Sequence, residues 1–153
     1  MKTLNQYINE SILDDEDELV TNSSTEIIKN FIDDNYKVSG KLDIKESNNI
    51  YIVNCNGDVR IKNDKITQLT NSFFEWGEVK GAFSCYECKS LKSLQGAPKK
   101  VGRSFYCSDC ESLTSLEGAP KKVGGDFGCN DCKIKFTEDD VKKVSKVKGK
   151  IIV

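Results

Sequence analysis

The chain has 153 residues, of which 31% are charged and 37% apolar, and its net charge is −1. This composition is ordinary for a globular domain with a modest core, and the near-neutral charge predicts no overall attraction to nucleic acid or membrane. The absence of histidine excludes Cys-His and Ser-His catalytic pairs and removes the commonest metal ligand. No apolar run approaches the roughly 20 residues of a membrane-spanning helix, and the N-terminus lacks the pattern of a secretory signal. We therefore expect the seven cysteines to lie in a reducing compartment rather than in disulfides.

The N-terminal part of the chain predicts an acidic tail followed by a helix. Residues 1–22 include the run DDEDE, whose density of like charge opposes compaction, so we expect a tail there. Ser23 and Glu26 have the spacing of a capping box, which predicts a helix over about 24–35. The expected apolar face of this helix consists of Ile27, Ile28, Phe31 and Ile32.

Apolar and polar residues alternate after this helix, in VSGKLDIK and NIYIVNCNGDVRIK, as they do in β-strands. Residues 46–49 and the pair Asn56-Gly57 are turn formers, so we expect the strands to be separated there. The helix and these strands together predict an N-terminal cap over residues 23–56.

A repeat of 22 residues follows and covers residues 57–134. The segment SL-x-SL-x-GAPKKVG occurs at 90–102 and again at 112–124. Three columns recur at the same interval: Phe83, Phe105 and Phe127; Cys85, Cys107 and Cys129; and Cys88, Cys110 and Cys132. A unit of this size cannot bury its own apolar face, but stacked copies can, so the repeat predicts a solenoid.

Each repeat unit predicts one strand and one returning turn. The F-x-C step has the period of a strand, so we expect Phe105 and Cys107 to face the core together. Leu113 and Leu116 are three residues apart and fit a tight turn that brings the chain back, with Pro120 and the glycines at the corners.

The stretch NDKITQLTNSFFEWGEVKG resembles a diverged unit of the same repeat. Ile66 and Leu69 stand where the leucines stand, and Phe73, Phe74 and Trp76 replace the GAP turn. We expect Trp76 to belong to the core of this unit rather than to a binding surface.

The positions of Phe105, Cys107, Cys110 and Leu113 resemble the leucine-rich-repeat (LRR) motif L-x-L-x-x-(N/C)-x-L, with one additional residue before the last leucine. The resemblance implies a short solenoid of stacked strands. The fold class that we expect is therefore mostly β: an LRR-like β-solenoid with 22-residue repeats and helical caps at both ends.

The C-terminal residues 135–153 predict a second cap. Thr137 has the position of an N-cap, with Asp140 three residues later, and the following pattern predicts a helix over about 138–145. A final strand is expected at 149–153. A polar helix at the end of a solenoid protects the last repeat from solvent.

The three Cys-x-x-Cys pairs admit two main interpretations. The spacing CYEC-x18-CSDC by itself indicates a zinc ribbon, in which Cys85, Cys88, Cys107 and Cys110 would bind the metal. However, three equally spaced pairs supply six thiols rather than four, and the phenylalanines and leucines share the interval. We therefore expect no metal and no cofactor, and interpret the cysteines as buried rows that pack like small apolar residues. Zinc is the alternative, and a redox dithiol is the third interpretation.

Three rows of side chains recur on the expected outer surface. A basic row consists of Lys99-Lys100, Lys121-Lys122 and Lys142-Lys143, and an acidic row consists of Glu87, Asp109 and Asp131. Tyr86, Tyr106 and Ser84 are expected on or near the strand face, where solenoids bind other proteins. The residues that we expect to bind a partner are Tyr86, Glu87, Tyr106, Asp109, Asp131, Lys121 and Lys122. For the lysines, the alternative is an ordinary solvated corner.

The acidic row and the near-neutral total make nucleic acid a weaker expectation than a protein partner, although six lysines can contact a phosphate backbone. The last strand, at 149–153, presents an open edge through which the chain can associate with itself.

The sequence MKTLNQYINE followed by Ser11 resembles the capsid-targeting peptides of internal head proteins in T-even-like tailed phages. The resemblance is carried by Met1-Lys2-Thr3, by the pair Tyr7-Ile8 and by the triplet Ile8-Asn9-Glu10, and it implies cleavage by the prohead protease between Glu10 and Ser11. The alternative is a short amphipathic helix. The whole chain also resembles small LRR-like proteins of tailed phages that infect gut bacteria, and the segments VGGDFxCxxC and FTEDDVKKV carry this resemblance.

The sequence contains no nucleophile-elbow, P-loop or zinc-protease motif, and we therefore expect no enzymatic activity. The resemblances imply a location in the phage capsid interior or the bacterial host cytoplasm. We expect a non-enzymatic protein-binding repeat module of phage origin, whose partner is a host or virion protein, and which as a packaged protein inhibits a host defence system. The alternatives are a virion structural component and a zinc-ribbon nucleic-acid-binding protein.

Overall fold

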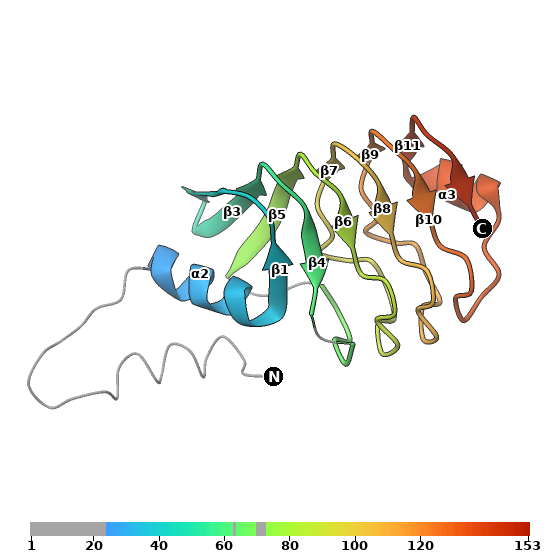
Figure 1. Ribbon diagram of the computed structural model, residues 1–153, viewed down its shortest axis with the longest axis horizontal. Coiled ribbons are helices and arrows are strands. Elements are labelled where there is room, and N and C mark those ends of the chain that lie inside the picture. The colour runs from blue at the N-terminus through green and yellow to red at the C-terminus, as the bar shows by residue number, and fades with distance from the viewer. Residues whose placement is uncertain (1–23, 63, 70–72) are drawn as a thin grey trace, which may run out of the picture.

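The computed structural model describes residues 24–62, 64–69 and 73–153, which form a β-solenoid (Figure 1). Beyond residue 55, successive turns of the chain each add one strand to each of two six-stranded sheets. This arrangement confirms the expected fold class of a mostly β solenoid with an N-terminal and a C-terminal helix. The expected tail, the capping residue Ser23 and the expected cleavage site at Glu10 and Ser11 lie outside the described residues.

The first sheet, sheet A, has the strand order β1-β4-β6-β8-β10-β12. Its strands are β1 (Tyr36–Val38), β4 (Val59–Ile61), β6 (Phe83–Ser84), β8 (Phe105–Tyr106), β10 (Phe127–Gly128) and β12 (Ile151–Ile152). From β4 to β12 all neighbours are parallel, and Phe83, Phe105 and Phe127 occupy the same register position. The 22-residue repeat is therefore the distance along the chain from one strand to its neighbour in the sheet.

The second sheet, sheet B, has the order β11-β9-β7-β5-β3-β2. Its strands are β2 (Leu42–Ser47), β3 (Ile50–Cys55), β5 (Phe74–Val79), β7 (Lys100–Val101), β9 (Lys122–Val123) and β11 (Lys146–Val147). The strands β7 and β9 consist of the Lys-Val pairs of the GAPKKVG segment, which the repeat pattern had suggested only as a corner. Each repeat thus contributes two strands instead of the single F-x-C strand that was predicted.

A column of aromatic rings fills the core along the axis of the solenoid. The ring centroids of Trp76 and Phe83 are 6.0 Å apart, those of Phe83 and Phe105 5.9 Å, and those of Phe105 and Phe127 5.1 Å. All four side chains are buried, so the expectation that Trp76 belongs to the core is confirmed. Each ring covers the next, which is how units without a core of their own stabilise one another.

The remaining side of each turn is irregular and is closed by leucines and a glycine turn. Leu91, Leu94, Leu113 and Leu116 are all buried there. Gly118 has a φ of +85°, in the left-handed region, and a Cβ on it would lie 2.4 Å from the Cα of Gln95. The backbone of the GAP turn therefore requires glycine, both for its conformation and for the close approach of the preceding turn.

The diverged unit keeps the leucine positions but not the turn. Ile66 and Leu69 are buried, as predicted. Phe74 and Trp76, however, belong to the six-residue strand β5, which replaces the two-residue strand of the later units. The longer strand pairs with β3, so the N-terminal turns are wider than the later ones.

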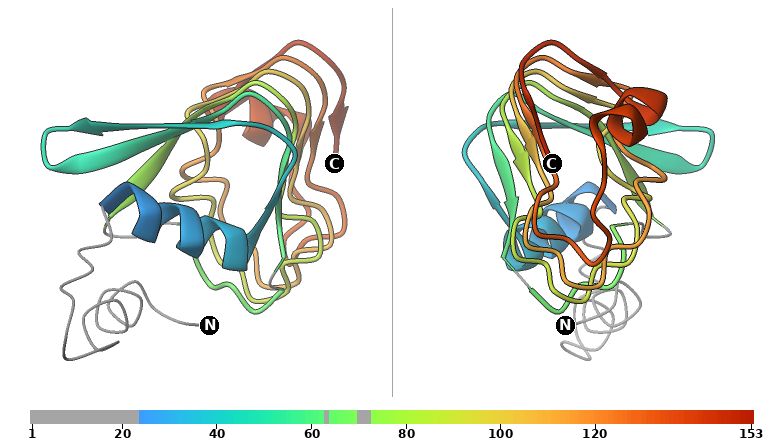
Figure 2. Two further views of the ribbon diagram at one scale, coloured as in Figure 1. Left: turned by 60° about the vertical axis from the view of Figure 1, so that its left-hand side comes forward. Right: turned by 90° about the vertical axis from the view of Figure 1, so that its right-hand side faces the viewer.

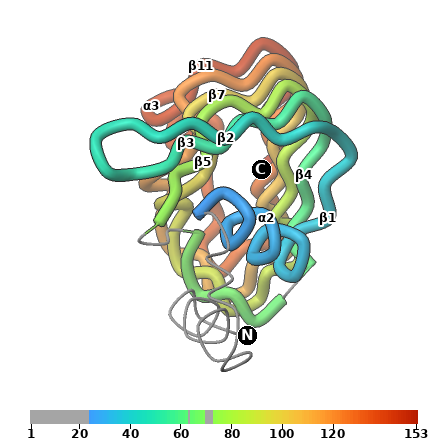
Figure 3. Tube along the Cα trace, turned by 90° about the vertical axis from the view of Figure 1, so that its left-hand side faces the viewer, coloured from blue at the N-terminus to red at the C-terminus, as the bar shows by residue number. Residues whose placement is uncertain are grey.

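Helix α2 (Ser24–Asn35) lies across the N-terminal opening of the solenoid, as predicted (Figure 3). Its residues Ile28, Phe31 and Ile32 are buried, and the ring of Phe31 contacts that of Phe74 at 6.0 Å. The chain then runs in the opposite direction to the later turns, because β1 pairs with β4 and β2 with β3 in antiparallel fashion.

Strands β2 and β3 form a hairpin that projects from the N-terminal end of the molecule (Figure 2). Its turn contains Asn48 and Asn49, both with positive φ (51° and 62°), which is the conformation of tight hairpin turns that asparagine tolerates well. The turn predicted at 46–49 is therefore present but shorter, because Glu46 and Ser47 still pair in β2.

Helix α3 (Glu138–Val144) forms the third side of the last turn, where earlier turns carry the leucines and the GAP segment. The predicted capping box is present: the Thr137 side chain accepts the N–H of Asp140, and the Asp140 carboxylate accepts the N–H of Thr137. Val141 points into the core and is fully buried. The expected final strand is shorter than 149–153, since only Ile151–Ile152 pair in β12, and Lys146–Val147 form the additional strand β11.

Candidate functional site

The cysteines lie in rows along the solenoid, as the repeat interval predicted. Cys85, Cys107 and Cys129 follow the strands of sheet A and have at most 1% of their surface exposed. The second row consists of Cys88, Cys110 and Cys132, three residues after the members of the first row. The thiol of Cys110 donates to the carbonyl oxygen of Cys85, and that of Cys132 to the carbonyl oxygen of Cys107, both at 3.1 Å. These bonds join successive turns of the coil.

Burial raises the pKa of most of these thiols. The pKa of Cys88 rises to about 12 and that of Cys132 to about 11, in both cases mainly because burial disfavours the thiolate. Burial also raises the pKa of Cys107. Cys85 and Cys129 are different, because hydrogen bonds lower their pKa: those from Cys107 and Cys110 act on Cys85, and that from Cys107 acts on Cys129. Both side chains are buried. The cysteines therefore have the chemistry of packing residues rather than of exposed nucleophiles.

Within the described ranges, no group of three or more histidine, cysteine, aspartate or glutamate side chains is placed so that it could hold a metal ion. The four cysteines of the zinc alternative are divided between the two rows. All seven cysteines are free thiols.

The acidic row occupies the turns that follow the strands of sheet A. Glu87, Asp109 and Asp131 all have positive φ, between 55° and 60°. The turns stack, since the N–H of Glu87 donates to the carbonyl oxygen of Ser108 and the N–H of Asp109 to that of Asn130. Aspartate tolerates this left-handed conformation better than most residues, so the turn itself favours the acidic side chains at Asp109 and Asp131.

Two tyrosines lie beside this row. Tyr86 is 40% exposed, and the negative charges of the neighbouring Asp109 and Glu87 raise its pKa. Tyr106 is half-buried on the outer face of β8, where a Cβ on Gly128 would lie only 3.0 Å from its ring. The small neighbour lets the ring lie flat over the next strand.

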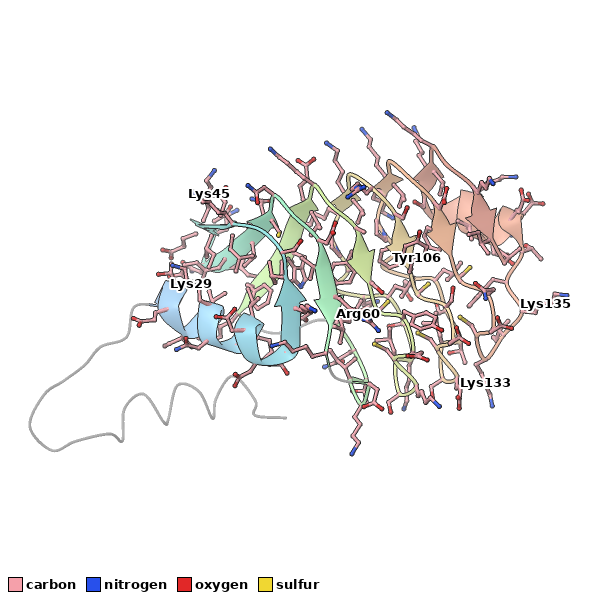
Figure 4. The ribbon with its side chains drawn as sticks, viewed as in Figure 1. Lys29, Lys45, Arg60, Tyr106, Lys133 and Lys135 are labelled. Atoms are coloured by element: carbon pink, nitrogen blue, oxygen red, sulfur yellow. The ribbon has the colours of Figure 1, made fainter. Side chains whose placement is uncertain are left out.

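Arg60 completes the surface, and the sequence analysis did not identify it. It is in register with Ser84, and Ser84 with Tyr106, on neighbouring strands, and both Arg60 and Tyr106 lie on the same face of the solenoid (Figure 4). The signal was present, because alternation in the stretch DVRIK points Arg60 outward between the buried Val59 and Ile61. We call the set Arg60, Tyr86, Glu87, Tyr106, Asp109 and Asp131 the tyrosine surface.

The predicted basic row lies on sheet B and is partly wrong. Lys100 and Lys122 are in register on β7 and β9, but the next residue of the row is Lys146 on β11. Lys142 and Lys143 instead belong to α3, where they pair with Glu138 at 2.7 Å and Asp140 at 3.3 Å. The last unit is longer than 22 residues because it contains this helix, so the fixed interval selected the wrong lysines.

The structure separates the predicted partner-binding residues into two sets. Tyr86, Glu87, Tyr106, Asp109 and Asp131 lie together on sheet A and its turns, whereas Lys121 and Lys122 lie at sheet B. Lys121 and Lys122 are exposed. Two further lysines near the basic row, Lys80 and Lys148, were missed because the repeat has glycine at their positions.

No family model matches the chain, and no curated protein or solved structure shows significant similarity to it. In the part of the chain that the structure describes, no helix is both long and apolar enough to cross a bilayer.

Proposed function

We propose that the chain is a non-enzymatic protein-binding module, and that the tyrosine surface is where its partner binds. The observation that carries this proposal is the placement of Tyr86, Tyr106 and Arg60 on one face of a stacked sheet. Tyrosine and arginine are the side chains that most often dominate the energetics of protein interfaces.

The rigidity of the surface supports the same proposal. Tyr106 packs over Gly128, so its ring loses little freedom when it is covered by a partner. The cost of immobilising side chains, about 0.5 to 1.5 kcal/mol for each flexible group, is therefore largely avoided. A preformed surface of this kind gains affinity without a change in shape.

The charge of the surface defines the chemistry of the partner. Three carboxylates, on Glu87, Asp109 and Asp131, stand beside the single cation of Arg60. Complementary charge speeds association and selects among partners, so the partner presents a basic segment with apolar groups that can cover the tyrosine rings.

The repeats supply the substitutions for the test. Ser84 occupies the position of Tyr106 in the preceding unit, and Ser108 occupies that of Tyr86 in the following one. The double variant Tyr86→Ser and Tyr106→Ser should therefore fold, with a circular dichroism melting curve close to that of the wild type. Lys92→Ala serves as the matched control because Lys92 is exposed and is not part of the tyrosine surface.

The experiment is capture of a partner from bacterial lysate with the three immobilised proteins, followed by measurement of the affinity for the purified partner. We expect stoichiometric capture by the wild type and by Lys92→Ala, and at least about a thirtyfold weaker affinity for the double variant, as two hot-spot residues imply. Equal affinities for the double variant and the control would contradict the tyrosine surface. Turnover of the partner by the chain would contradict a role that is purely binding.

The phage resemblance supports a more specific form of this proposal, in which the protein is packaged in the phage head and inhibits a host defence enzyme. Its support is the likeness of the first eleven residues to capsid-targeting peptides. Mass spectrometry of purified virions should detect the chain beginning at Ser11, and heads that contain the chain with Met1 intact would contradict packaging by that signal. A captured partner that is a capsid protein would instead favour a virion structural component.

A further inference from the structure

A groove of about 630 Å³ runs along the outer side of sheet B, away from the tyrosine surface. Lys100, Lys122 and Lys146 form one side of it, on three neighbouring parallel strands. Lys80 and Lys148 also line it. Figure 4 shows nitrogen-tipped side chains projecting along this upper edge of the solenoid. We call this feature the lysine groove.

The floor of the groove results from the stacking of the repeats. A Cβ on Gly124 would lie 2.1 Å from the carbonyl oxygen of Gly102, and a Cβ on Gly102 would lie 2.2 Å from that of Lys80. The middle turns therefore cannot carry side chains at this position, whereas the outer turns carry Lys80 and Lys148 there. Lys148 occupies the position of Gly124 one turn later, because the N–H of Gly124 donates to the carbonyl oxygen of Val101 and the N–H of Lys148 donates to that of Val123.

The charge of the groove is not balanced. Five lysines line it, together with one carboxylate, that of Glu78, which pairs with Lys100 at 2.7 Å. Across the described ranges, no carboxylate lies within ion-pair distance of Lys122, Lys146 or Lys148. Other lysines of the repeat do have partners, such as Lys99 with Glu75 at 2.8 Å.

The like charges of this arrangement disfavour the fold when no anion is present. Like charges on neighbouring strands repel one another, and an outward position of a strand is better occupied by a β-branched or neutral side chain. The side chains of Lys122 and Lys146 are exposed. An anion in the groove would remove the repulsion.

The groove offers donors and almost no acceptors. Its lining consists of lysines, valines and glycines apart from Glu78, and the backbone groups of the strands are used in the sheet. A peptide needs acceptors for its N–H groups as well as donors, whereas a phosphate presents only acceptors. The lining includes no aromatic side chain on which a base could stack, so recognition is limited to the phosphates.

We propose that the lysine groove binds a compact anion with several phosphate groups, such as an oligophosphate or the phosphates of a nucleotide. The three lysines in register span about 10 Å, two strand spacings of roughly 4.8 Å, which matches a few linked phosphates rather than a long duplex. The volume of the groove is also in the range of sites for small molecules. This function uses a surface separate from that of the proposed protein partner.

The test is isothermal titration of the purified full chain, at an ionic strength of about 0.05 M, with tripolyphosphate, ATP, AMP and a six-nucleotide single strand. We expect saturable binding of tripolyphosphate and ATP, weaker binding of AMP, and a loss of affinity with added salt. The oligonucleotide distinguishes phosphodiesters from chain phosphates as the natural source. Binding of any of these phosphates that depends on the groove supports the proposal.

The variant Lys122→Gln with Lys146→Gln should weaken tripolyphosphate binding by at least about tenfold, because two charged contacts are lost. The matched control is Lys142→Gln, an exposed lysine of α3 that does not line the groove, for which we expect less than about a twofold change. No saturable binding of any phosphate, or equal affinities in the two variants, would overturn the proposal. A peptide with the sequence of residues 13–19, LDDEDEL, is titrated in the same way. If it binds more tightly than tripolyphosphate, the proposal is overturned and the groove is assigned to an acidic protein segment.

Discussion

Replacement of one cysteine tests whether the thiols are packing residues or metal ligands. Cys110 belongs to the four-cysteine set of the zinc alternative, and it is fully buried. Cys132 is its equivalent one repeat later, donates the same kind of hydrogen bond at 3.1 Å, and does not belong to that set. Cys110→Ala and Cys132→Ala therefore form a matched pair that differs chiefly in the proposed zinc ligation.

The expected cost of Cys110→Ala follows from its surroundings. Loss of a sulfur atom, which is close in size to a methylene group, removes about 0.8 kcal/mol of transfer free energy. A residual cavity of about 25 Å³ adds about 0.6 kcal/mol. The carbonyl oxygen of Cys85 still accepts the N–H of Cys88 at 3.2 Å, so no buried acceptor is left without a partner. The free energy of unfolding should therefore fall by about 1 to 2 kcal/mol, and by less in Cys132→Ala because that side chain is only half-buried.

Loss of a structural zinc ligand would have a different magnitude. Structural zinc sites contribute apparent binding free energies of about 10 to 16 kcal/mol, which is as large as the whole stability of a typical domain. Urea denaturation in a reducing buffer, followed by the fluorescence of Trp76, separates the two cases because this is the single tryptophan and it is buried. A Cys110→Ala protein that is unfolded while Cys132→Ala remains folded, or a wild type that EDTA unfolds, would refute the packing interpretation.

Two further predictions concern the core. Stability should fall as the pH rises from about 9 to 11, because unfolded thiols lose their protons near pH 9, whereas Cys132 and Cys88 keep theirs to about 11 and 12 in the native state. Urea midpoints at pH 9, 10 and 11 measure this, because the lowered pKa of Cys85 affects stability only below pH 9; a midpoint that rises over this range contradicts the prediction. Phe105→Leu should cost about 0.5 to 1.5 kcal/mol more than Phe127→Leu, because Phe105 pairs with two rings, those of Phe83 and Phe127, whereas Phe127 pairs with one among the described residues. Equal urea midpoints for these two variants would show that the ring column adds nothing beyond burial.

The central part of the fold was predictable because several residue types repeat with one period. Phe105, Cys107, Cys110 and Leu113 all recur at or near 22 residues, and only a stack of equivalent turns buries all of these columns at once. The interval also showed that the cysteines follow the coil and do not form a cluster of their own. The two helices were predictable for a local reason, since capping and apolar spacing act within a few residues.

The second strand of each turn was not predictable from periodicity. Lys100–Val101 and Lys122–Val123 are two residues long, which is too short for alternation to be visible. Strand direction at the N-terminus was hidden for a related reason, because Val38-x-Gly40 resembles the repeat corner although the chain there runs antiparallel to the later turns. Such features depend on which neighbour a segment meets in space.

The candidate surfaces were only partly predictable from the sequence. Which residues lie side by side on them depends on the pairing register of neighbouring strands and not on a constant 22-residue interval. Arg60 joins the tyrosine surface across 24 residues, and Lys146 continues the row of Lys122 across the same distance, since these end units are longer than the central ones. The row Lys142-Lys143 was wrong because a helix was inserted where the repeat has a turn. An interval taken from the central repeats therefore fails at both ends of the stack.

The separation of charge is the feature that the net charge concealed. A total of −1 argues against binding of anions only if the charges are evenly mixed, and along the acidic row and the lysine groove one sign predominates. In each repeat the acidic residue lies in the turn after sheet A, where left-handed backbone favours aspartate, and the lysine lies on the outer face of sheet B. Stacking repeats therefore lengthens an acidic row and a basic row at the same time without changing the total. Because the two rows are on different sides of the coil, an anion in the lysine groove leaves the tyrosine surface free for a protein partner.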